Sequence, residues 1–179
     1  MRAFIGIGGN LGNVAATFRT AASELRAIGQ VVRVSSMYEG APRDAFDQPR
    51  FLNAAIEMEV DLEPHDLLVE LKRLELSLGR DPQGRRFGPR VVDLDILLID
   101  GRCVTDVEHD LIVPHPRLHE RRFALEPVAE LDPGLHPWRG QGCADLRIDV
   151  SVADLLATVA GQDVVRVGGP EWADPVSAD

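Results

Sequence analysis

The segment RRFGPRVVDLDILLID, residues 85–100, places an arginine-rich loop directly before an apolar strand. Residues 92–99 are apolar on both faces beyond Asp95, which predicts a strand in the centre of a sheet. Side chains at positions i and i+2 of a strand point to the same side, so Asp93 and Asp95 share a face, about 6.6 Å apart along the chain. Leu94 and Ile96 then point the other way, into the core.

Working outward from this strand, the apolar pattern predicts the order β-α-β-β-α-β. The expected elements are strands at 2–8, 31–38, 51–60 and 92–99, with helices at 13–28 and 64–78. This order is that of the ferredoxin-like plan, an α+β fold in which helices cover one face of an antiparallel sheet. Two loops, 39–49 and 80–89, are long enough to suggest a functional role.

The remaining chain predicts a C-terminal extension with short helices near 125–131 and 152–159. We therefore expect a single domain over residues 1–170 and a flexible tail over 171–179.

Composition excludes several classes of protein. The formal net charge of -10 argues against a nucleic-acid partner. No apolar run is long enough for a membrane helix, and the first residues are typical of a strand rather than a signal peptide. Cys103 and Cys143 form neither a disulfide framework nor a metal-ligand spacing, so we expect two plain thiols in a reducing cytoplasm. We also expect a monomer.

Two common nucleotide-binding motifs are missing. A P-loop needs lysine within Gly-Lys-Ser/Thr, but the only lysine, Lys72, follows Leu71. The dinucleotide fingerprint G-x-G-x-x-G would need glycine where Leu11 stands. We interpret Gly8, Gly9 and Asn10 as a tight connection from strand to helix, with Asn10 or Asn13 near the helix cap.

Two carboxylates on one face of a rigid strand repel each other unless a cation lies between them. Oxygen ligands favour Mg²⁺, which commonly shares phosphate oxygens with its substrate. Arginines in the preceding loop can bind the same phosphates through paired N–H donors. The combination suits phosphoryl transfer. The alternative is a solvent-facing strand whose two acids simply pair with a charged loop.

The segment also resembles the G-R…G-P-R-x-x-D-L-D signature of the 6-hydroxymethyl-7,8-dihydropterin pyrophosphokinase family. Four further motifs are similar to those of this family and follow in the same order, between about residues 4 and 133. They are GGNLG at Gly8–Gly12, SSMYEGAP at Ser35–Pro42, DQPRFLNAA at Asp47–Ala55 and VPHPRLHERRF at Val113–Phe123.

The resemblance implies transfer of diphosphate from ATP to 6-hydroxymethyl-7,8-dihydropterin in folate biosynthesis, with two Mg²⁺ ions held by Asp93 and Asp95. The implied catalytic residues are Arg80, Arg86, Arg90 and Asp95. The implied pterin-binding residues are Gly40, Ala41, Arg43, Phe51, Asn53, Phe87, Asp93 and Phe123. The implied ATP-binding residues are Lys72, Glu75, Arg80, Arg86, Arg90, Ile96, Leu111, Ile112, His115 and Arg121.

In this reading Phe51 and Phe123 sandwich the pterin ring, and Ile96, Leu111 and Ile112 line an adenine pocket. Arg122, beside Arg121, is expected to face solvent. The chain departs from the family pattern in four places, at Gly9, at Gly40–Ala41, at Pro82 and at Phe87. Pro82 stands where a second loop arginine is common, so one phosphate contact is either missing or supplied by Arg85.

Two other functions stay open on the residues alone. One is a different metal-dependent transferase with a D-x-D motif, such as a nucleotide-sugar transferase, which would release no AMP. The other is a non-catalytic ferredoxin-like binding module, which would show no metal-dependent nucleotide binding.

Overall fold

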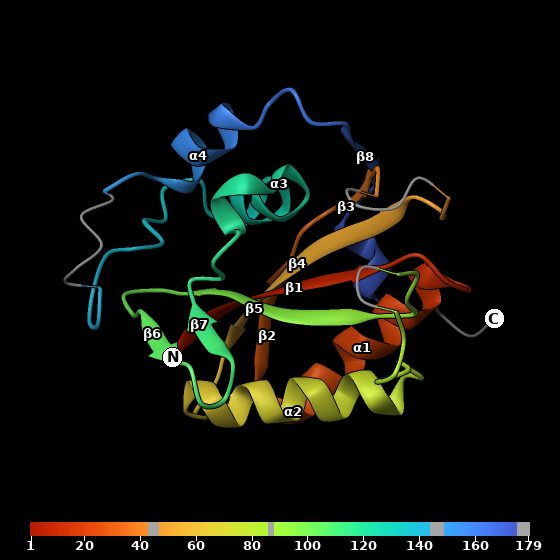
Figure 1. Cartoon of the computed structure of the whole chain (residues 1–179), viewed down its shortest axis with the longest axis horizontal. Helices are drawn as coiled ribbons and strands as arrows, with labels where there is room; N and C mark the ends of the chain where they lie inside the picture. Colours follow the sequence, from red (N-terminus) through yellow and green to blue (C-terminus); the bar gives the residue numbers. More distant parts are fainter. Residues whose placement is uncertain (43–46, 86–87, 144–148, 175–179) are drawn as a thin grey trace.

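A computed structural model describes residues 1–42, 47–85, 88–143 and 149–174 (Figure 1). Its main sheet has the strand order β5-β1-β4-β3-β8, with β2 also pairing β4, and all of these pairs are antiparallel. The strands are β1 (Arg2–Gly9), β2 (Gln30–Val34), β3 (Met37–Gly40), β4 (Phe51–Glu59), β5 (Asp93–Ile99) and β8 (Val164–Gly168). This arrangement confirms the predicted ferredoxin-like α+β fold.

Helices cover both faces of the sheet rather than one. Figure 1 shows α1 and α2 below the sheet and α3 and α4 above it. The helices are α1 (Val14–Ile28), α2 (Pro64–Ser77), α3 (Arg122–Leu131) and α4 (Val152–Thr158), with short 3-10 helices η1 (Leu118–Glu120) and η2 (Pro170–Ala173). The helices of the predicted ferredoxin-like unit, α1 and α2, lie on one face as expected, and α3 and α4 of the C-terminal extension cover the other face.

The alternation of side chains along the strands produces two cores. Ile5, Leu94 and Ile96 pack on the side of α1 and α2, as predicted for Leu94 and Ile96. Phe4 and Leu97 pack on the other side, against α3 and α4. The aspartates of β5 therefore face the side of α3.

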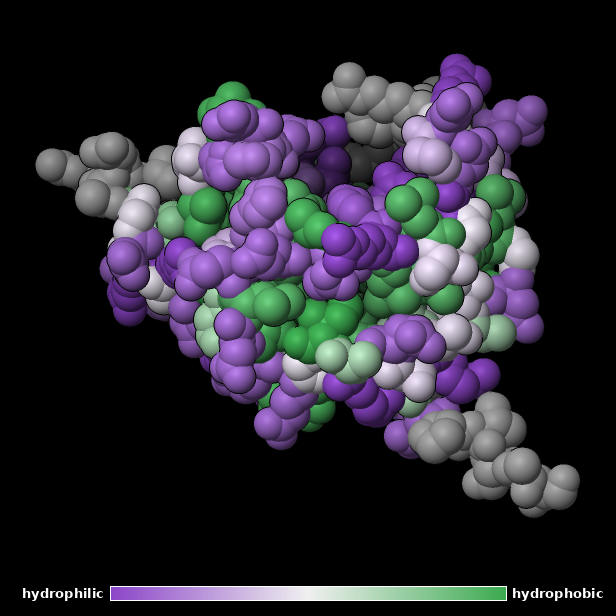
Figure 2. Space-filling view, turned by 90° about the horizontal axis from the view of Figure 1, so that it is seen from below, coloured by the Kyte–Doolittle hydropathy of each residue, from purple (hydrophilic) through white to green (hydrophobic). Residues whose placement is uncertain are grey.

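The outer surface of α1 and α2 carries mainly hydrophilic side chains around a central hydrophobic area (Figure 2). Within the described ranges, no helix has both the length and the apolar character needed to cross a membrane.

The predicted strand at 31–38 is interrupted at two buried serines. Ser35 Oγ accepts from Ala55 N at 2.9 Å and donates to Ser36 O at 2.8 Å. Ser36 N and Oγ donate to the Glu130 carboxylate of α3. These side-chain bonds replace part of the sheet ladder, so the segment forms β2 and β3 instead of one strand.

The strand β5 lies at the end of the sheet, so the prediction of a central strand is wrong. Its outer edge is nevertheless covered. Leu94 N donates to Glu75 Oε1 at 2.5 Å, Lys72 Nζ donates to Leu94 O at 3.0 Å, and His115 N donates to Leu97 O at 2.8 Å. A hairpin of β6 (Val104–Asp106) and β7 (Leu111–Val113) packs nearby. An edge protected in this way has the apolar composition of a central strand.

The expectation of two plain thiols is also wrong, because Cys103 and Cys143 form a disulfide. The chain folds back so that Cys103 N donates to Gln141 O at 2.8 Å and Arg102 bridges Gln141. This pairing places the two cysteine Cα atoms 5.1 Å apart. The two cysteines lie 40 positions apart in the sequence, so no local pattern indicates that they pair.

The end of the chain is anchored further than the predicted tail boundary at 171. Trp172 in η2 is only 4% exposed, and its Nε1 donates to Ser35 O at 2.7 Å. Its ring meets Phe18 edge-on, with centroids 5.8 Å apart. The packed chain therefore extends to Ala173.

We expect Trp172→Ala to lower the free energy of unfolding by about 3–5 kcal/mol, because a large buried ring leaves a cavity. Glu171→Ala is the control, since Glu171 is exposed and should change stability by less than about 0.5 kcal/mol. Urea denaturation of both variants measures the difference. Equal stabilities would show that η2 is not anchored in solution.

Candidate active site

A cavity of about 340 Å³ opens on the α3 face of the sheet. Residues from β1, β3, β4, β5, α2, α3 and three loops line it. They include the sequence-predicted residues Gly40, Ala41, Phe51, Asn53, Lys72, Arg80, Arg90, Asp93, Asp95, His115, Arg121 and Phe123. Residues far apart in the sequence therefore meet in one concave site.

Two glycines of β1 form the floor. Gly6 lies opposite Asp95 and Gly8 opposite Asp93 in the register of β1 with β5. A Cβ on Gly8 would lie 3.2 Å from Asn53 Oδ1, and one on Gly6 would lie 3.0 Å from Leu97 Cδ2. A side chain at Gly8 would crowd Asn53, and one at Gly6 would crowd Leu97. Because both positions are glycine, the space between the carboxylates and Asn53 stays open.

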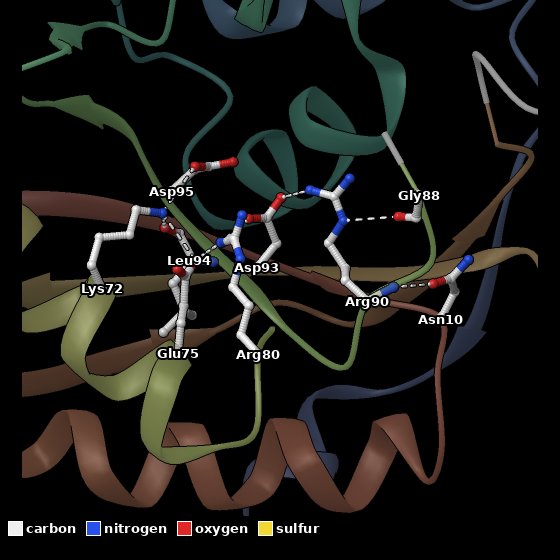
Figure 3. Close-up of polar contacts among 9 residues, drawn as sticks. All are labelled: Asn10, Lys72, Glu75, Arg80, Gly88, Arg90, Asp93, Leu94 and Asp95. Carbon is white, nitrogen blue, oxygen red and sulfur yellow. Dashed lines mark hydrogen bonds and ion pairs between the residues drawn. The ribbon is translucent and has the colours of Figure 1, made fainter. Parts of the chain in front are cut away.

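Asp93 is held by two arginines (Figure 3). Arg80 Nη1 lies 2.5 Å from Asp93 Oδ1, and Arg90 Nη1 lies 2.8 Å from Asp93 Oδ2. The carboxylate therefore has a cation on each oxygen, and both guanidinium groups are aimed at the cavity floor. Arginines pre-positioned in this way can transfer their remaining N–H donors to the oxygens of a bound anion.

Asp95 is compensated less well. Its Oδ1 lies 3.8 Å from Nζ of Lys72, against 2.5 Å and 2.8 Å for the two arginine contacts of Asp93. Burial, and after it the nearby Asp93 carboxylate, raise the pKa of Asp95 above its usual range. An added cation at this face would remove the repulsion between the two carboxylates.

Glu75 connects α2 to the site from below (Figure 3). Its side chain is 2% exposed, and its Oε1 accepts from Leu94 N, Lys72 Nζ and Arg80 Nη1. Burial raises the pKa of Glu75, although Lys72 opposes this effect. Glu75 does not line the cavity and instead positions two of its cations.

Asn10 fixes the arginine loop to the end of β1. Its Oδ1 accepts from Arg90 N at 2.8 Å (Figure 3), while its Nδ2 donates to Pro49 O at 2.9 Å. Asn10 thus joins the loops on either side of the cavity, and Asn13 caps α1 by accepting from Ala16 N. Of the two asparagines predicted as candidates for the helix cap, Asn13 is therefore the one that caps α1.

The wall opposite the carboxylates is aromatic and amide-bearing. Phe51 and Asn53 lie on β4, Phe123 lies in the first turn of α3, and Gly40 ends β3. Asn53 is 7% exposed, and its side-chain bond within the described residues is a long one, from Nδ2 to Phe51 O at 3.3 Å. The guanidinium carbons of Arg90 and Arg121 lie 5.8 Å and 5.6 Å from the ring centroids of Phe51 and Phe123. A flat heteroaromatic ligand could stack here and bond to the Asn53 amide.

His115 faces the carboxylates from the loop after β7. Burial lowers the pKa of His115, although Asp95 opposes this effect. Its Nδ1 accepts from Arg117 N at 3.1 Å. A neutral ring that accepts at Nδ1 carries its proton on Nε2, which can donate to an anion.

Several predicted residues are not brought to the cavity. Ile96 and Leu111 belong to the core on the opposite face, and Ile112 is 40% exposed. Strand alternation explains Ile96, which points away from the aspartates beside it. Arg85, offered as a substitute for the arginine absent at Pro82, is exposed and lies outside the cavity lining. Arg43, Arg86 and Phe87 lie outside the described residues.

Nine lining residues were not among the predicted site residues, namely Gly6, Ile7, Gly8, Pro42, Gln48, Ala54, Leu97, Arg117 and Ala124. Arg117 lies two residues after His115 within the motif PHPRL, and the predicted phosphate contact of His115 could have pointed to it. Gly6 and Gly8 alternate in β1, which is the signal of an open floor.

The donor set at the cavity floor fits Mg²⁺. Among the described residues no group of three or more His, Cys, Asp or Glu could enclose a metal ion. Asp93 and Asp95 share one sheet face and open into the cavity. Mg²⁺ is commonly held by one or two carboxylates, with substrate phosphates and water completing its shell.

The family model of 7,8-dihydro-6-hydroxymethylpterin-pyrophosphokinase (HPPK) matches residues 4–133. The chain belongs to this family. A pyrophosphokinase from Methylorubrum extorquens is 41% identical over 136 residues, which cover 75% of this chain and 84% of the relative. One from Bacillus subtilis is 42% identical over 131 residues, covering 72% and 77%.

Longer relatives also match. The folate synthesis bifunctional protein of Arabidopsis thaliana is 43% identical over 128 residues, and the match covers 71% of this chain but 26% of that protein. The chain thus spans about a quarter of this relative. The crystal structure of wild-type Plasmodium falciparum HPPK-DHPS has a TM-score of 0.63 at 12% identity, covering 88% of this chain and 40% of that one. This likeness concerns the fold alone.

We expect Glu75→Ala to lower the free energy of unfolding by about 2–4 kcal/mol, because buried donors lose their acceptor. Glu70→Ala is the matched control on the same helix, since Glu70 forms only a surface pair with Arg73. Thermal or urea unfolding of both variants checks this. A Glu75→Ala protein as stable as the control would contradict the role of Glu75 as the anchor of β5.

Proposed function

We propose that this chain transfers the terminal diphosphoryl group of ATP to the hydroxymethyl oxygen of 6-hydroxymethyl-7,8-dihydropterin. The oxygen forms a bond to the β-phosphorus as its proton leaves, and the bond from the α,β-bridging oxygen to that phosphorus breaks to give AMP. One observation carries the proposal. The two carboxylates lie on the floor of a single cavity, between a group of cations and a wall of phenylalanines and one asparagine.

On the side of β5, the proposal assigns the triphosphate to the cations. Asp93 and Asp95 would hold two Mg²⁺ ions, which would neutralise phosphate charge when bound. Arg80 and Arg90, now paired with Asp93, would bind phosphate oxygens. Arg121 and the Nε2 proton of His115 would add donors from the opposite loop. Lys72 lies beside Asp95 and would meet the same charge.

On the side of β4, the proposal assigns the pterin to the aromatic wall. Phe51 and Phe123 would stack on the ring, and Asn53 would meet its polar edge. Gly40 and Ala41 would offer backbone groups from the end of β3. The alternation of β4 supports this assignment, because Phe51 and Asn53 share one face.

A site built within one chain agrees with a monomer. The predicted cytoplasmic location stays a prediction, and the Cys103–Cys143 disulfide does not support it, because such bonds are rare in a reducing compartment.

The direct experiment supplies ATP, Mg²⁺ and the pterin together and measures AMP and pterin diphosphate by chromatography. Equal amounts of both products support the proposal. ADP in place of AMP would indicate transfer of a single phosphoryl group. A nucleotide-sugar transferase or a non-catalytic module would form no AMP at all.

We expect Asp95→Asn to fold normally and to lose at least about 100-fold in the rate of AMP formation, because one metal-ligand charge is removed. Asp61→Asn, at an exposed position, is the control. Initial rates and melting temperatures are measured side by side. Turnover near that of the unmodified protein would contradict the metal role of Asp95.

We expect Phe123→Ala to weaken pterin binding by about tenfold, since a stacked ring contributes about 1–1.5 kcal/mol beyond its area. Binding of a non-hydrolysable ATP analogue with Mg²⁺ should change far less. Calorimetric titration of each ligand separates the two affinities. Equal losses would identify Phe123 as a core residue and not a stacking partner.

A further inference from the structure

The helix α3 begins without a cap of its own. Its N-cap residue, Arg121, makes no capping bond through its side chain. The first amides of a helix have no partner within the helix, so they need one from elsewhere. Phe123 lies in this first turn and lines the cavity. The placement of its ring therefore depends on what holds the turn.

Gln162, from the loop between α4 and β8, supplies the missing cap. Its Oε1 accepts from Arg122 N at 3.1 Å, and its Nε2 donates to Glu120 O at 2.8 Å. One amide side chain therefore bonds to the backbone on both sides of Arg121. The cap comes from 40 residues away in the sequence, where local capping rules give no sign of it.

Arg122 holds Gln162 in return. Its Nη1 donates to Ala160 O at 2.9 Å and to Gln162 O at 2.8 Å, and its Nε donates to Glu126 at 2.7 Å. The expectation that Arg122 faces solvent is therefore wrong. The side chain of Arg122 binds the backbone of the segment whose side chain caps its own amide.

The next residues of this segment reach the other wall of the cavity. Asp163 accepts from Arg50 Nη1 at 2.7 Å, directly before Phe51. Val164 pairs with Gly40. A Cβ on Gly40 would lie 3.6 Å from Val164 Cγ2 and 3.7 Å from Phe123 Cβ. The segment 160–164 thus contacts α3, β3 and the start of β4 together.

We propose that Gln162 is a positioning residue for the pterin side of the site, acting through the first turn of α3 on Phe123. The inference rests on the proposed function for its ligand but on the contacts above for its geometry. The family match ends at residue 133, so the chain beyond the match would contribute to the shape of the pocket. Asp93, Asp95, Arg80 and Arg90 make their ion pairs away from this segment, and of the proposed triphosphate ligands Arg121 adjoins it, so the effect should fall more on the pterin than on the triphosphate.

Three variants test the role of Gln162. Gln162→Met keeps the length of the side chain but neither accepts nor donates. Gln162→Glu keeps the acceptor for Arg122 N and loses the donor to Glu120 O. Gln30→Met is the matched control, because Gln30 is exposed and pairs with Glu59 at the far end of β4 from Phe51.

The first measurement is amide hydrogen exchange at residues 121–125 in the free protein. Losing a helix cap should speed this exchange about five- to tenfold in Gln162→Met, less in Gln162→Glu and not at all in Gln30→Met. The second is calorimetric titration with the pterin in the presence of Mg²⁺ and a non-hydrolysable ATP analogue. Pterin affinity should fall by a similar factor in Gln162→Met, with the affinity for the analogue alone changing less than about twofold.

Unchanged exchange in Gln162→Met would overturn the proposal, and so would equal losses of affinity for both ligands. If the unmodified protein bound no pterin while exchange still rose in Gln162→Met, the proposed function would fail and the positioning of α3 by Gln162 would stand. The two measurements therefore separate the inference from the function on which it rests.

Discussion

The structure depends on the alternation of side chains along two neighbouring strands, β1 and β5. In β5 it sends Leu94 and Ile96 into the core and Asp93 and Asp95 to the opposite face. In β1 it places Gly6 and Gly8 opposite the aspartates. A shift of one residue in either strand would bury carboxylates among leucines, at a cost that no nearby cation could offset. The register that forms the core is thus the register that opens the site.

The electrostatics of the site follow from this placement. A chain with a formal charge of -10 gathers arginines where two carboxylates share one face. Arg80 and Arg90 occupy both oxygens of Asp93, while Asp95 lies 3.8 Å from Lys72. The charge of Asp93 is therefore neutralised at closer range than the charge of Asp95. A polyphosphate that arrives with metal ions could take over the arginines through its oxygens, while its metal ions bind the two carboxylates. Each charged group would then keep a partner of opposite charge.

The sequence predicted the parts of the structure that depend on local pattern. Periodicity located β1, α1, β4, α2 and β5 to within a few residues, and motif resemblance predicted most of the cavity lining. The pattern failed where distant contacts decide. The predicted strand is split at Ser35 and Ser36 because the hydroxyl of Ser35 bonds to the backbone and Glu130 binds Ser36. Cys103 meets Cys143 through a returning loop. Ile96 was predicted to line an adenine pocket, but the alternation of side chains along β5 points it into the core.

The edge position of β5 accounts for the identity of several site residues. A strand at the end of a sheet exposes backbone groups that must find partners. Glu75 and Lys72 bond to Leu94, and the backbone of His115 bonds to Leu97. Lys72 and His115 also line the cavity, and Glu75 holds Arg80. Closing the edge and building the site are therefore carried out by the same residues, so the aspartates lie on a strand that is both rigid and accessible. A central strand would be equally rigid, but a neighbouring strand would occupy the edge from which these cations reach the carboxylates.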